Sequence, residues 1–167
     1  LNELVQQVNG EFAERFEGRN LDLICILQPE PLLIRADSRR IWRVLENLYV
    51  NVCKYAMPGT RVYVDAIKKD GKIQFSIKNI SENPLNFQAD ELTERFIRGD
   101  VSRSTEGSGL GLSIAKNLTV LQHGSFNIYL DGDLFKVTIT FDEAKKKKKP
   151  MPPMIVPEAV QEEAQQD

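Results

Sequence analysis

Two β-hairpin patterns constrain the fold of this 167-residue chain more than any other feature. In each, two runs of alternating apolar and polar residues flank a tight turn, Asp70-Gly71 in the first and Asp131-Gly132-Asp133 in the second. Such turns between alternating runs predict antiparallel strand pairs. The paired runs are residues 61–67 with 72–79, and residues 125–130 with 134–141.

Helical patterns lie before and between these hairpins, at residues 1–17, 37–56 and 109–122. This order differs from the regular strand–helix–strand alternation of a doubly wound fold. We therefore expect a two-layer α/β (α+β) sandwich, in which a mixed, mainly antiparallel sheet carries helices on one face.

The helix over residues 37–56 has the clearest limits. Asp37 is a favourable N-cap, and Pro58-Gly59 prevents the helix from continuing. Its apolar stripe predicts a buried face made of Ile41, Val44, Leu45, Leu48, Val52 and Tyr55. We also expect short strands over residues 21–27 and 32–34, and one helical turn near residues 90–96.

The end of the chain differs in composition. Lys145 to Lys149 are consecutive lysines, followed by a Pro-rich segment and an acidic, Gln-rich finish. Such a segment has too few apolar residues to form a packed core. We predict a folded domain over residues 1–143 and a disordered tail over residues 144–167.

Bulk properties exclude some classes of function. The net charge of −2 gives no electrostatic reason for nucleic acid as a partner. The chain shows neither a signal peptide nor an apolar run near the roughly 20 residues that span a bilayer. Its two cysteines, Cys25 and Cys53, lack metal-ligand spacing and indicate reduced thiols in a reducing compartment, so we expect a cytoplasmic domain. Because it begins without Met, we expect it to be a piece of a longer protein.

A first polar cluster lies on the helix over residues 37–56. Asn47, Asn51 and Lys54 are spaced i, i+4, i+7 and share one helix face beside the apolar stripe. Two amides and an ammonium group suit a metal ion and the phosphates that it binds. The same residues also suit the polar flank of an amphipathic helix, and the spacing alone does not decide.

The second cluster is Gly107-Ser108-Gly109-Leu110-Gly111-Leu112, placed just before a helix. Closely spaced glycines let backbone N–H groups approach a phosphate, and the N-terminus of a helix adds further donors. It is not a P-loop, because no Lys-Ser/Thr follows, and no strand precedes it as in a dinucleotide fingerprint.

The third cluster is Glu94-Arg95-Phe96-Ile97-Arg98-Gly99-Asp100, with Arg103 shortly after it. It belongs to an irregular stretch from residue 80 to 108, and long irregular stretches in a compact domain are often lids. Arginines here can bind phosphate oxygens through two hydrogen bonds. A solvated surface loop is the alternative.

Taken in chain order, the clusters resemble the Asn helix, the Phe motif and the glycine motif of sensor histidine kinase catalytic domains. That family shares a superfamily with gyrase-type topoisomerases, heat-shock chaperones and mismatch-repair ATPases. The resemblance covers residues 1–141 and implies a Bergerat-type fold that binds ATP with Mg²⁺ between the Asn helix and a lid.

The resemblance also implies roles for single residues. Asn51 would bind the magnesium ion with Asn47 beside it, and Lys54 would contact phosphate. Tyr55 would pack near the adenine, which Asn79 would read. The lid would supply phosphate contacts from Arg98 and Arg103, with Arg98 as a stabiliser of the transferred group. The phosphates would rest in a cradle made of Gly107, Ser108, Gly109, Leu110, Gly111 and Leu112.

One motif departs from the family pattern. Where the family has Asp-x-Gly-x-Gly, this chain has Asn79-Ile80-Ser81-Glu82-Asn83. An Asn can accept a hydrogen bond from the adenine amine and can also donate to a guanine carbonyl, so we expect weaker discrimination between the bases. Ser81 and Asn83 are less suited than glycine to positive φ. A degenerate nucleotide-binding module without catalysis is therefore one alternative function.

Asn47 bears on the reaction. Hydrolases and serine kinases of the superfamily carry a Glu four residues before the metal-binding Asn, as a general base for water or a hydroxyl. Asn47 cannot accept a proton, and Glu46 lies about 100° away around the helix. A neutral imidazole needs no base, so Asn47 favours a protein-histidine kinase over these alternatives.

The only histidine of the chain, His123, precedes Gly124 at the end of a predicted helix, where the family has a structural His-Gly. The acceptor histidine is instead expected on an upstream dimerisation and His-phosphotransfer domain outside this chain. The resemblance further implies a response regulator as partner, and a homodimeric parent protein anchored in the cell membrane.

Overall fold

The computed structural model describes residues 1–85 and 110–145, and both expected hairpins are present in it. The first consists of β2 (Arg61–Lys69) and β3 (Lys72–Ile80), and the second of β4 (Ser125–Asp131) and β5 (Leu134–Asp142). Asp70 and Gly71 both have positive φ, as the tight turn of the first hairpin requires. The hairpins join through β3 and β5, which pair antiparallel.

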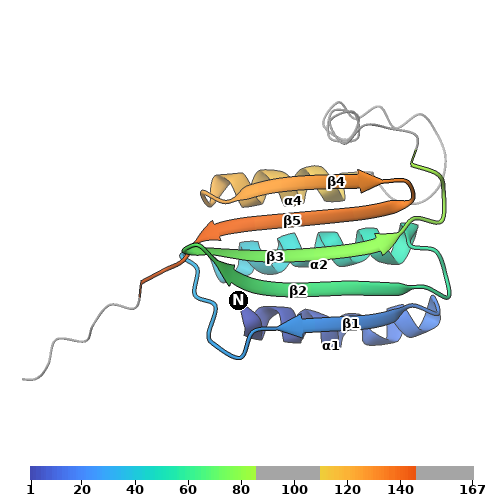
Figure 1. Ribbon diagram of the computed structural model, residues 1–167, viewed down its shortest axis with the longest axis horizontal. Coiled ribbons are helices and arrows are strands. Elements are labelled where there is room, and N and C mark those ends of the chain that lie inside the picture. The colour runs from blue at the N-terminus through green and yellow to red at the C-terminus, as the bar shows by residue number, and fades with distance from the viewer. Residues whose placement is uncertain (86–109, 146–167) are drawn as a thin grey trace, which may run out of the picture.

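One further strand completes the sheet. β1 (Asp22–Leu27) pairs parallel with β2, and the strand order is β1-β2-β3-β5-β4 (Figure 1). The sheet is thus mixed and mainly antiparallel, as the sequence predicts. Its two edges in the described part of the chain are β1 and β4.

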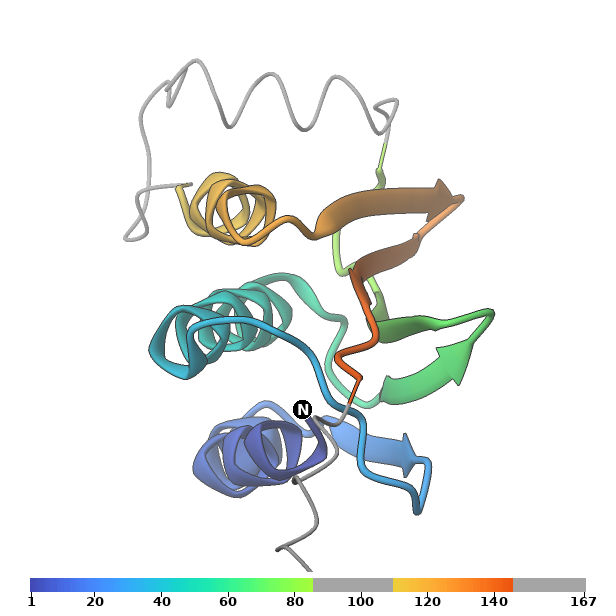
Figure 2. The same ribbon diagram turned by 90° about the vertical axis from the view of Figure 1, so that its left-hand side faces the viewer.

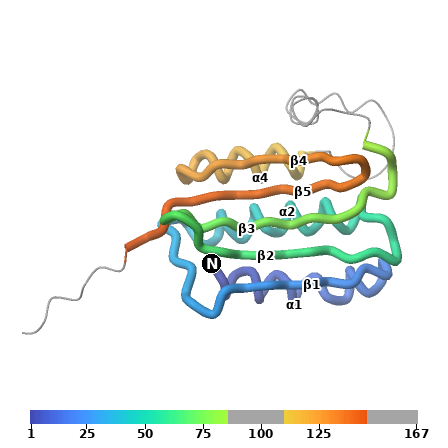
Figure 3. The backbone as a smooth tube through the Cα atoms, in the orientation of Figure 1, coloured from blue at the N-terminus to red at the C-terminus, as the bar shows by residue number. Residues whose placement is uncertain are grey.

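In the described part of the chain, three helices form the second layer (Figure 3): α1 (Asn2–Gly18), α2 (Ser38–Tyr55) and α4 (Gly111–Leu121). All three cover the same face of the sheet, as Figure 2 shows. The Asp37 side chain accepts hydrogen bonds from the N–H groups of Arg39 and Arg40, which confirms it as the N-cap of α2. None of the described helices is long and apolar enough to span a bilayer.

The core lies between the two layers. Alternate residues of β2, β3 and β5 are buried against the helices, because successive side chains of a strand point to opposite faces of the sheet. Both the expected two-layer class and the placement of helices on one face are confirmed.

The predicted strand over residues 32–34 is wrong. Only Ile34 makes a bridge, to Glu143. The Asn2 side chain takes up the hydrogen bonds of the preceding segment: its Nδ2 donates to the carbonyls of Gln28 and Glu30, and its Oδ1 accepts from the Leu32 N–H. A side chain from α1 therefore replaces a neighbouring strand.

The predicted core stripe of α2 needs one correction. Tyr55 is 43% exposed, whereas Tyr49 is fully buried and was missed. The Tyr49 ring stacks on Phe16 of α1 at 5.7 Å between centroids, and its hydroxyl donates to Asn9. Burial raises the pKa of the Tyr49 hydroxyl, so that it stays a neutral donor. The reason for the error is that α1 covers the side of α2 that carries Tyr49.

The helical turn predicted near residues 90–96 lies outside the described residues. The C-terminal boundary also remains a prediction. At the end of the described chain, the Ala144 N–H still donates to the Leu33 carbonyl at 2.8 Å.

Candidate functional site

The contact between α2 and α4 brings two of the three sequence clusters together. A Cβ added at Gly111, the first residue of α4, would lie 3.3 Å from Oδ1 of Asn47. The Asn47 Nδ2 group donates to the Arg43 carbonyl at 2.7 Å, which leaves Oδ1 as the atom that faces Gly111. Glycine at this position lets the N-terminus of α4 approach the amides of α2 closely.

Among the described residues, no side chain caps the first N–H groups of α4. Leu110 occupies the N-cap position and makes no side-chain cap hydrogen bond. Leu112 is buried and anchors the end of the glycine motif in the core. The first N–H groups of a helix and its dipole attract anions, so this end of α4 offers a phosphate site beside Asn47.

The polar stripe of α2 continues from Asn47 toward the C-terminus of the helix. Asn51 is half-buried, and Lys54 and Tyr55 are exposed. Lys54 follows Asn47 and Asn51 at the spacing i, i+4, i+7, which puts the three residues on one side of α2. The stripe thus presents neutral oxygen ligands first and a positive charge one turn later.

Asn79 lies on the helix-facing side of β3 and is only 3% exposed. Its Nδ2 group donates to the Ile80 carbonyl at 3.1 Å. Its Oδ1 atom is buried without a hydrogen-bond partner, a state that otherwise occurs among the described side chains only at Nε of Arg19. A buried acceptor without a partner is costly, typically by about 1–3 kcal/mol, and this one suits a donor from a ligand.

The last turn of α2 is held against the end of β3. The Met57 N–H donates to the Ile80 carbonyl at 2.9 Å, and the Glu82 N–H donates to the Tyr55 carbonyl at 2.8 Å. Ala56 and Ser81 form a bridge between the two segments. These bonds place Asn79 beside the C-terminal half of α2, which carries Asn51, Lys54 and Tyr55.

Arg19, which no pattern in the sequence indicates, supports this junction. Its Nη2 group donates to the Ala56 carbonyl and to Oε2 of Glu82, both at 3.1 Å. Arg19 follows α1 and meets these groups only in the tertiary structure, so no spacing or motif in the sequence indicates it.

The missing glycines of the Asp-x-Gly-x-Gly motif cause no backbone strain here. Among the described residues other than glycine, only Asn20, Asp70 and His123 have positive φ. Ser81 instead donates its N–H to the Asp133 carbonyl at 2.7 Å. The expected penalty at Ser81 and Asn83 is therefore not found.

His123 lies beyond the C-terminus of α4, so the full length of this 11-residue helix, about 17 Å at 1.5 Å per residue, separates it from Gly111. It has a φ of 64° and closes the helix, and its N–H donates to the Val120 carbonyl. The next residue, Gly124, is required by packing, since a Cβ there would lie 2.6 Å from the Phe141 ring. This geometry supports the structural interpretation of His123.

A metal ion at this site would be coordinated by amide oxygens of the protein and by phosphate oxygens of the bound ligand. Nowhere in residues 1–85 and 110–145 do three or more His, Cys, Asp or Glu side chains gather as a metal site. Mg²⁺ commonly takes one or two protein oxygens and completes its shell with phosphate and water. The amide oxygens of Asn51 and Asn47 fit that requirement.

Five of the predicted site residues lie outside the described residues: Arg98, Arg103, Gly107, Ser108 and Gly109. The lid contacts therefore stay predictions. Asn47, Asn51, Lys54, Tyr55, Asn79, Leu110, Gly111 and Leu112 are described.

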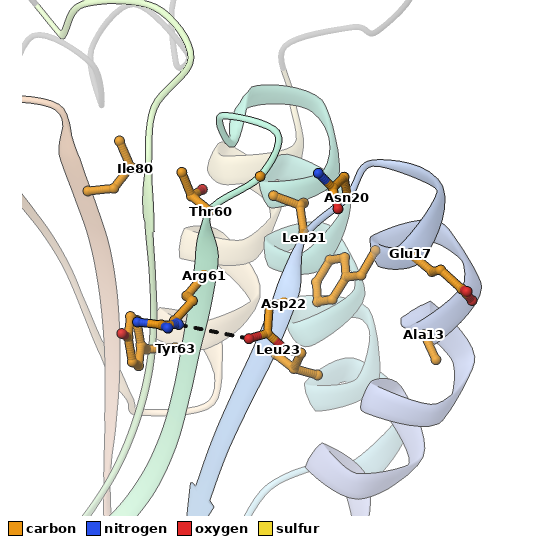
Figure 4. Close-up of a pocket in the computed structure, with 12 residues that line it drawn as sticks. Ala13, Glu17, Asn20, Leu21, Asp22, Leu23, Thr60, Arg61, Tyr63 and Ile80 are labelled. Atoms are coloured by element: carbon orange, nitrogen blue, oxygen red, sulfur yellow. Dashed lines mark ion pairs between the residues drawn. The ribbon is translucent and has the colours of Figure 1, made fainter.

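A groove of about 860 Å³ lies elsewhere, at the start of β1 (Figure 4). Residues of α1, β1 and β2 line it, including Glu17, Leu23 and Tyr63. None of the predicted site residues lines this groove, so it is distinct from the site between α2 and α4.

The family model and the curated relatives that this chain matches point to the same family. The chain matches the family model of histidine kinase-, DNA gyrase B-, and HSP90-like ATPases over residues 36–146. The signal transduction histidine-protein kinase BaeS of Escherichia coli is 30% identical over 123 residues, which are 72% of this chain and 26% of BaeS. The sensor histidine kinase RppB of Synechocystis sp. is 29% identical over 130 residues, 77% of this chain and 29% of RppB. The chain thus spans less than a third of these curated relatives.

Solved structures agree on the fold. The catalytic domain of histidine kinase ThkA, in a nucleotide-free form, superposes with a TM-score of 0.73 at 25% identity, over 86% of this chain and 92% of that domain. ThkA has also been solved in complex with the response regulator protein TrrA. That structure matches with a TM-score of 0.68 at 24% identity, over 89% of this chain and 42% of the other.

Proposed function

The chain belongs to the family of histidine kinase-, DNA gyrase B-, and HSP90-like ATPases, and we propose that it is the ATP-binding catalytic domain of a sensor histidine kinase. In this proposal it binds ATP with Mg²⁺ and donates the γ-phosphate to a histidine outside the chain. The observations that carry it are the contact between Asn47 and the N-terminus of α4, and the buried acceptor of Asn79 beside the last turn of the same helix α2.

Different described residues bind different parts of the ligand. The Oδ1 atom of Asn79 accepts a hydrogen bond from the exocyclic amine of adenine, the donor that this buried oxygen lacks. Lys54 and the first N–H groups of α4 bind phosphate oxygens. Asn51, with Asn47 beside it, would hold a magnesium ion, which neutralises phosphate charge when it is bound.

Asn79 favours adenine over guanine for a structural reason. One N–H of its Nδ2 group is bonded to the Ile80 carbonyl, and the side-chain atom without any partner is the acceptor Oδ1. Rotating the amide to offer a donor to guanine would set Oδ1 against the Ile80 carbonyl oxygen. We therefore propose a preference for ATP over GTP, and the weaker base discrimination expected from the sequence stays the alternative that nucleotide binding must test.

The absence of a general base at position 47 favours histidine as the acceptor. The Asn47 amide bonds the Arg43 carbonyl and cannot take a proton. A neutral imidazole attacks the γ-phosphorus with its own lone pair: the P–N bond forms, the bond to the bridging oxygen breaks, and ADP leaves. No described side chain needs to accept a proton for this step.

The partners of the parent protein follow from this role. We propose that the acceptor histidine lies on a dimerisation domain of the same protein, and that a response regulator receives the phosphate. The ThkA–TrrA complex supports a regulator of this kind. A homodimeric parent in the cell membrane, with this domain on the cytoplasmic side, completes the proposal.

A labelling experiment tests the function. The chain alone, incubated with γ-labelled ATP and Mg²⁺, should incorporate no phosphate. Adding the dimerisation domain of the parent protein should give acid-labile phosphohistidine on that domain, and Asn51→Ala should abolish it. Acid-stable phosphoserine, or rapid ATP hydrolysis without an acceptor, would instead identify a serine kinase or a hydrolase. Failure to bind millimolar nucleotide in calorimetry would indicate a degenerate module.

A further inference from the structure

The outer edge of β1 carries a palindrome. Residues 23–27 read Leu-Ile-Cys-Ile-Leu in both directions. β1 ends the strand order, so no other strand of the described part of the chain pairs with its outer side. No charged residue and no proline lies within the palindrome, although natural edge strands usually carry such residues to prevent pairing.

The main-chain groups that face outward can be identified from the ladder with β2. The Asp22 N–H donates to the Thr60 carbonyl at 3.1 Å, and the Gln28 N–H donates to the Ala66 carbonyl at 3.3 Å. Successive residues of a strand direct these groups to opposite sides. The N–H and C=O groups of Leu23, Cys25 and Leu27 therefore point away from the sheet.

From this edge we infer that two copies of the chain associate through antiparallel pairing of β1 with β1, about a two-fold axis at Cys25. Antiparallel pairing sets Leu23 against Leu27 of the second copy, Ile24 against Ile26, and Cys25 against Cys25. Every cross-strand pair is then an identical pair of side chains, and the outward N–H and C=O groups find partners. The two sheets become one, with all helices on the same face.

The surroundings of β1 fit a second copy of the chain as its partner. The groove of about 860 Å³ runs beside Leu21, Asp22 and Leu23 (Figure 4). In the pairing it receives Leu27 and Gln28 of the second copy. Asp22, the one charge at this end of the strand, lies 3.9 Å from Arg61, which offsets it.

Exposure on the open face of the sheet agrees with the inference. Ile26 is 63% exposed, an unusual position for a large apolar side chain on an edge strand. At the opposite edge, the exposed side chains of β4 are the polar Ser125, Asn127 and Asp131, together with Tyr129, which is 53% exposed. That edge is not self-complementary, and it supplies a matched control.

Sedimentation of the 167-residue chain in reducing buffer tests the association over a concentration series that reaches the millimolar range. Wild type should form a dimer. Ile26→Lys should weaken it at least about tenfold, because two Ile24–Ile26 pairs are lost and an ammonium group enters each. Asn127→Lys adds the same charge on β4 and should leave the dimer unchanged. A monomer at every concentration, or equal dimers in both variants, would overturn the inference.

Oxidative cross-linking tests the register independently. Directly opposed residues that exchange both main-chain hydrogen bonds have Cα atoms about 5.5 Å apart, within the range for a disulfide. Copper–phenanthroline should therefore link wild-type chains through Cys25, and the link should weaken in Ile26→Lys. The double variant Cys25→Ser, Asn127→Cys, with its cysteine on β4, should not link. Equal linking through Asn127→Cys, or none through Cys25, would contradict the proposed pairing.

Discussion

Replacing Asn79 with leucine should separate the stability of the unliganded domain from nucleotide binding. The two side chains have similar shapes, and Asn79 is almost fully buried. Leucine removes the buried Oδ1 acceptor that has no partner, which should raise the free energy of unfolding by about 1–3 kcal/mol. It also removes the hydrogen bond from Nδ2 to the Ile80 carbonyl, which should lower the free energy of unfolding by about 0.5–1.5 kcal/mol. The Ile80 carbonyl keeps the Met57 N–H as a partner, so no new buried group is left unpaired.

The difference between these terms is a change in the free energy of unfolding between about −0.5 and +2.5 kcal/mol, so Asn79→Leu should be neutral or stabilising without nucleotide. The affinity for ATP should fall, because the adenine amine loses its acceptor. A loss of about 1–3 kcal/mol corresponds to roughly five- to more than a hundredfold.

Urea unfolding without nucleotide and calorimetry with Mg-ATP and Mg-GTP provide the two measurements. Wild type should bind ATP at least about tenfold more tightly than GTP, and the variant should lose most of this preference. Ser76→Ala is a matched control on the same strand: it removes a bond to Asp65, lowers stability and should leave nucleotide affinity unchanged. A free energy of unfolding more than about 2 kcal/mol below that of wild type, or an ATP affinity equal to that of wild type, would refute the proposed role of Asn79.

Three further changes probe other parts of the domain. Asn51→Ala should remove the Mg²⁺-dependent part of the ATP affinity and leave the Mg²⁺-independent part, as calorimetry with and without EDTA would show; equal losses would argue against a metal ligand. Gly124→Ala should destabilise the domain by about 1–3 kcal/mol, since the new Cβ would lie 2.6 Å from the Phe141 ring; urea unfolding measures this, and ATP affinity should not change. Deleting residues 146–167 should leave the melting temperature and the nucleotide affinity unchanged, because a segment of that composition adds no core; a substantial loss of either would show that the tail packs on the domain.

The sequence by itself determined the elements whose signals are local. Tight turns and period-two alternation fix both hairpins, and a capped amphipathic pattern fixes α2 to within a residue. The order of the polar clusters also predicts the family, because the motifs need no knowledge of distant contacts. Local propensity and periodicity act within a few residues, so the sequence displays them directly.

Only the tertiary structure decided features that depend on residues far apart in the chain. The pattern of α2 does not distinguish Tyr49 from Tyr55, because burial of Tyr49 requires α1 on that side of the helix. The segment after β1 is held by Asn2 instead of a neighbouring strand. The amide of Asn79 is oriented by a carbonyl at the end of its own strand, which leaves an acceptor for the ligand. In each case a contact formed in the folded state selects among conformations that the local sequence allows equally.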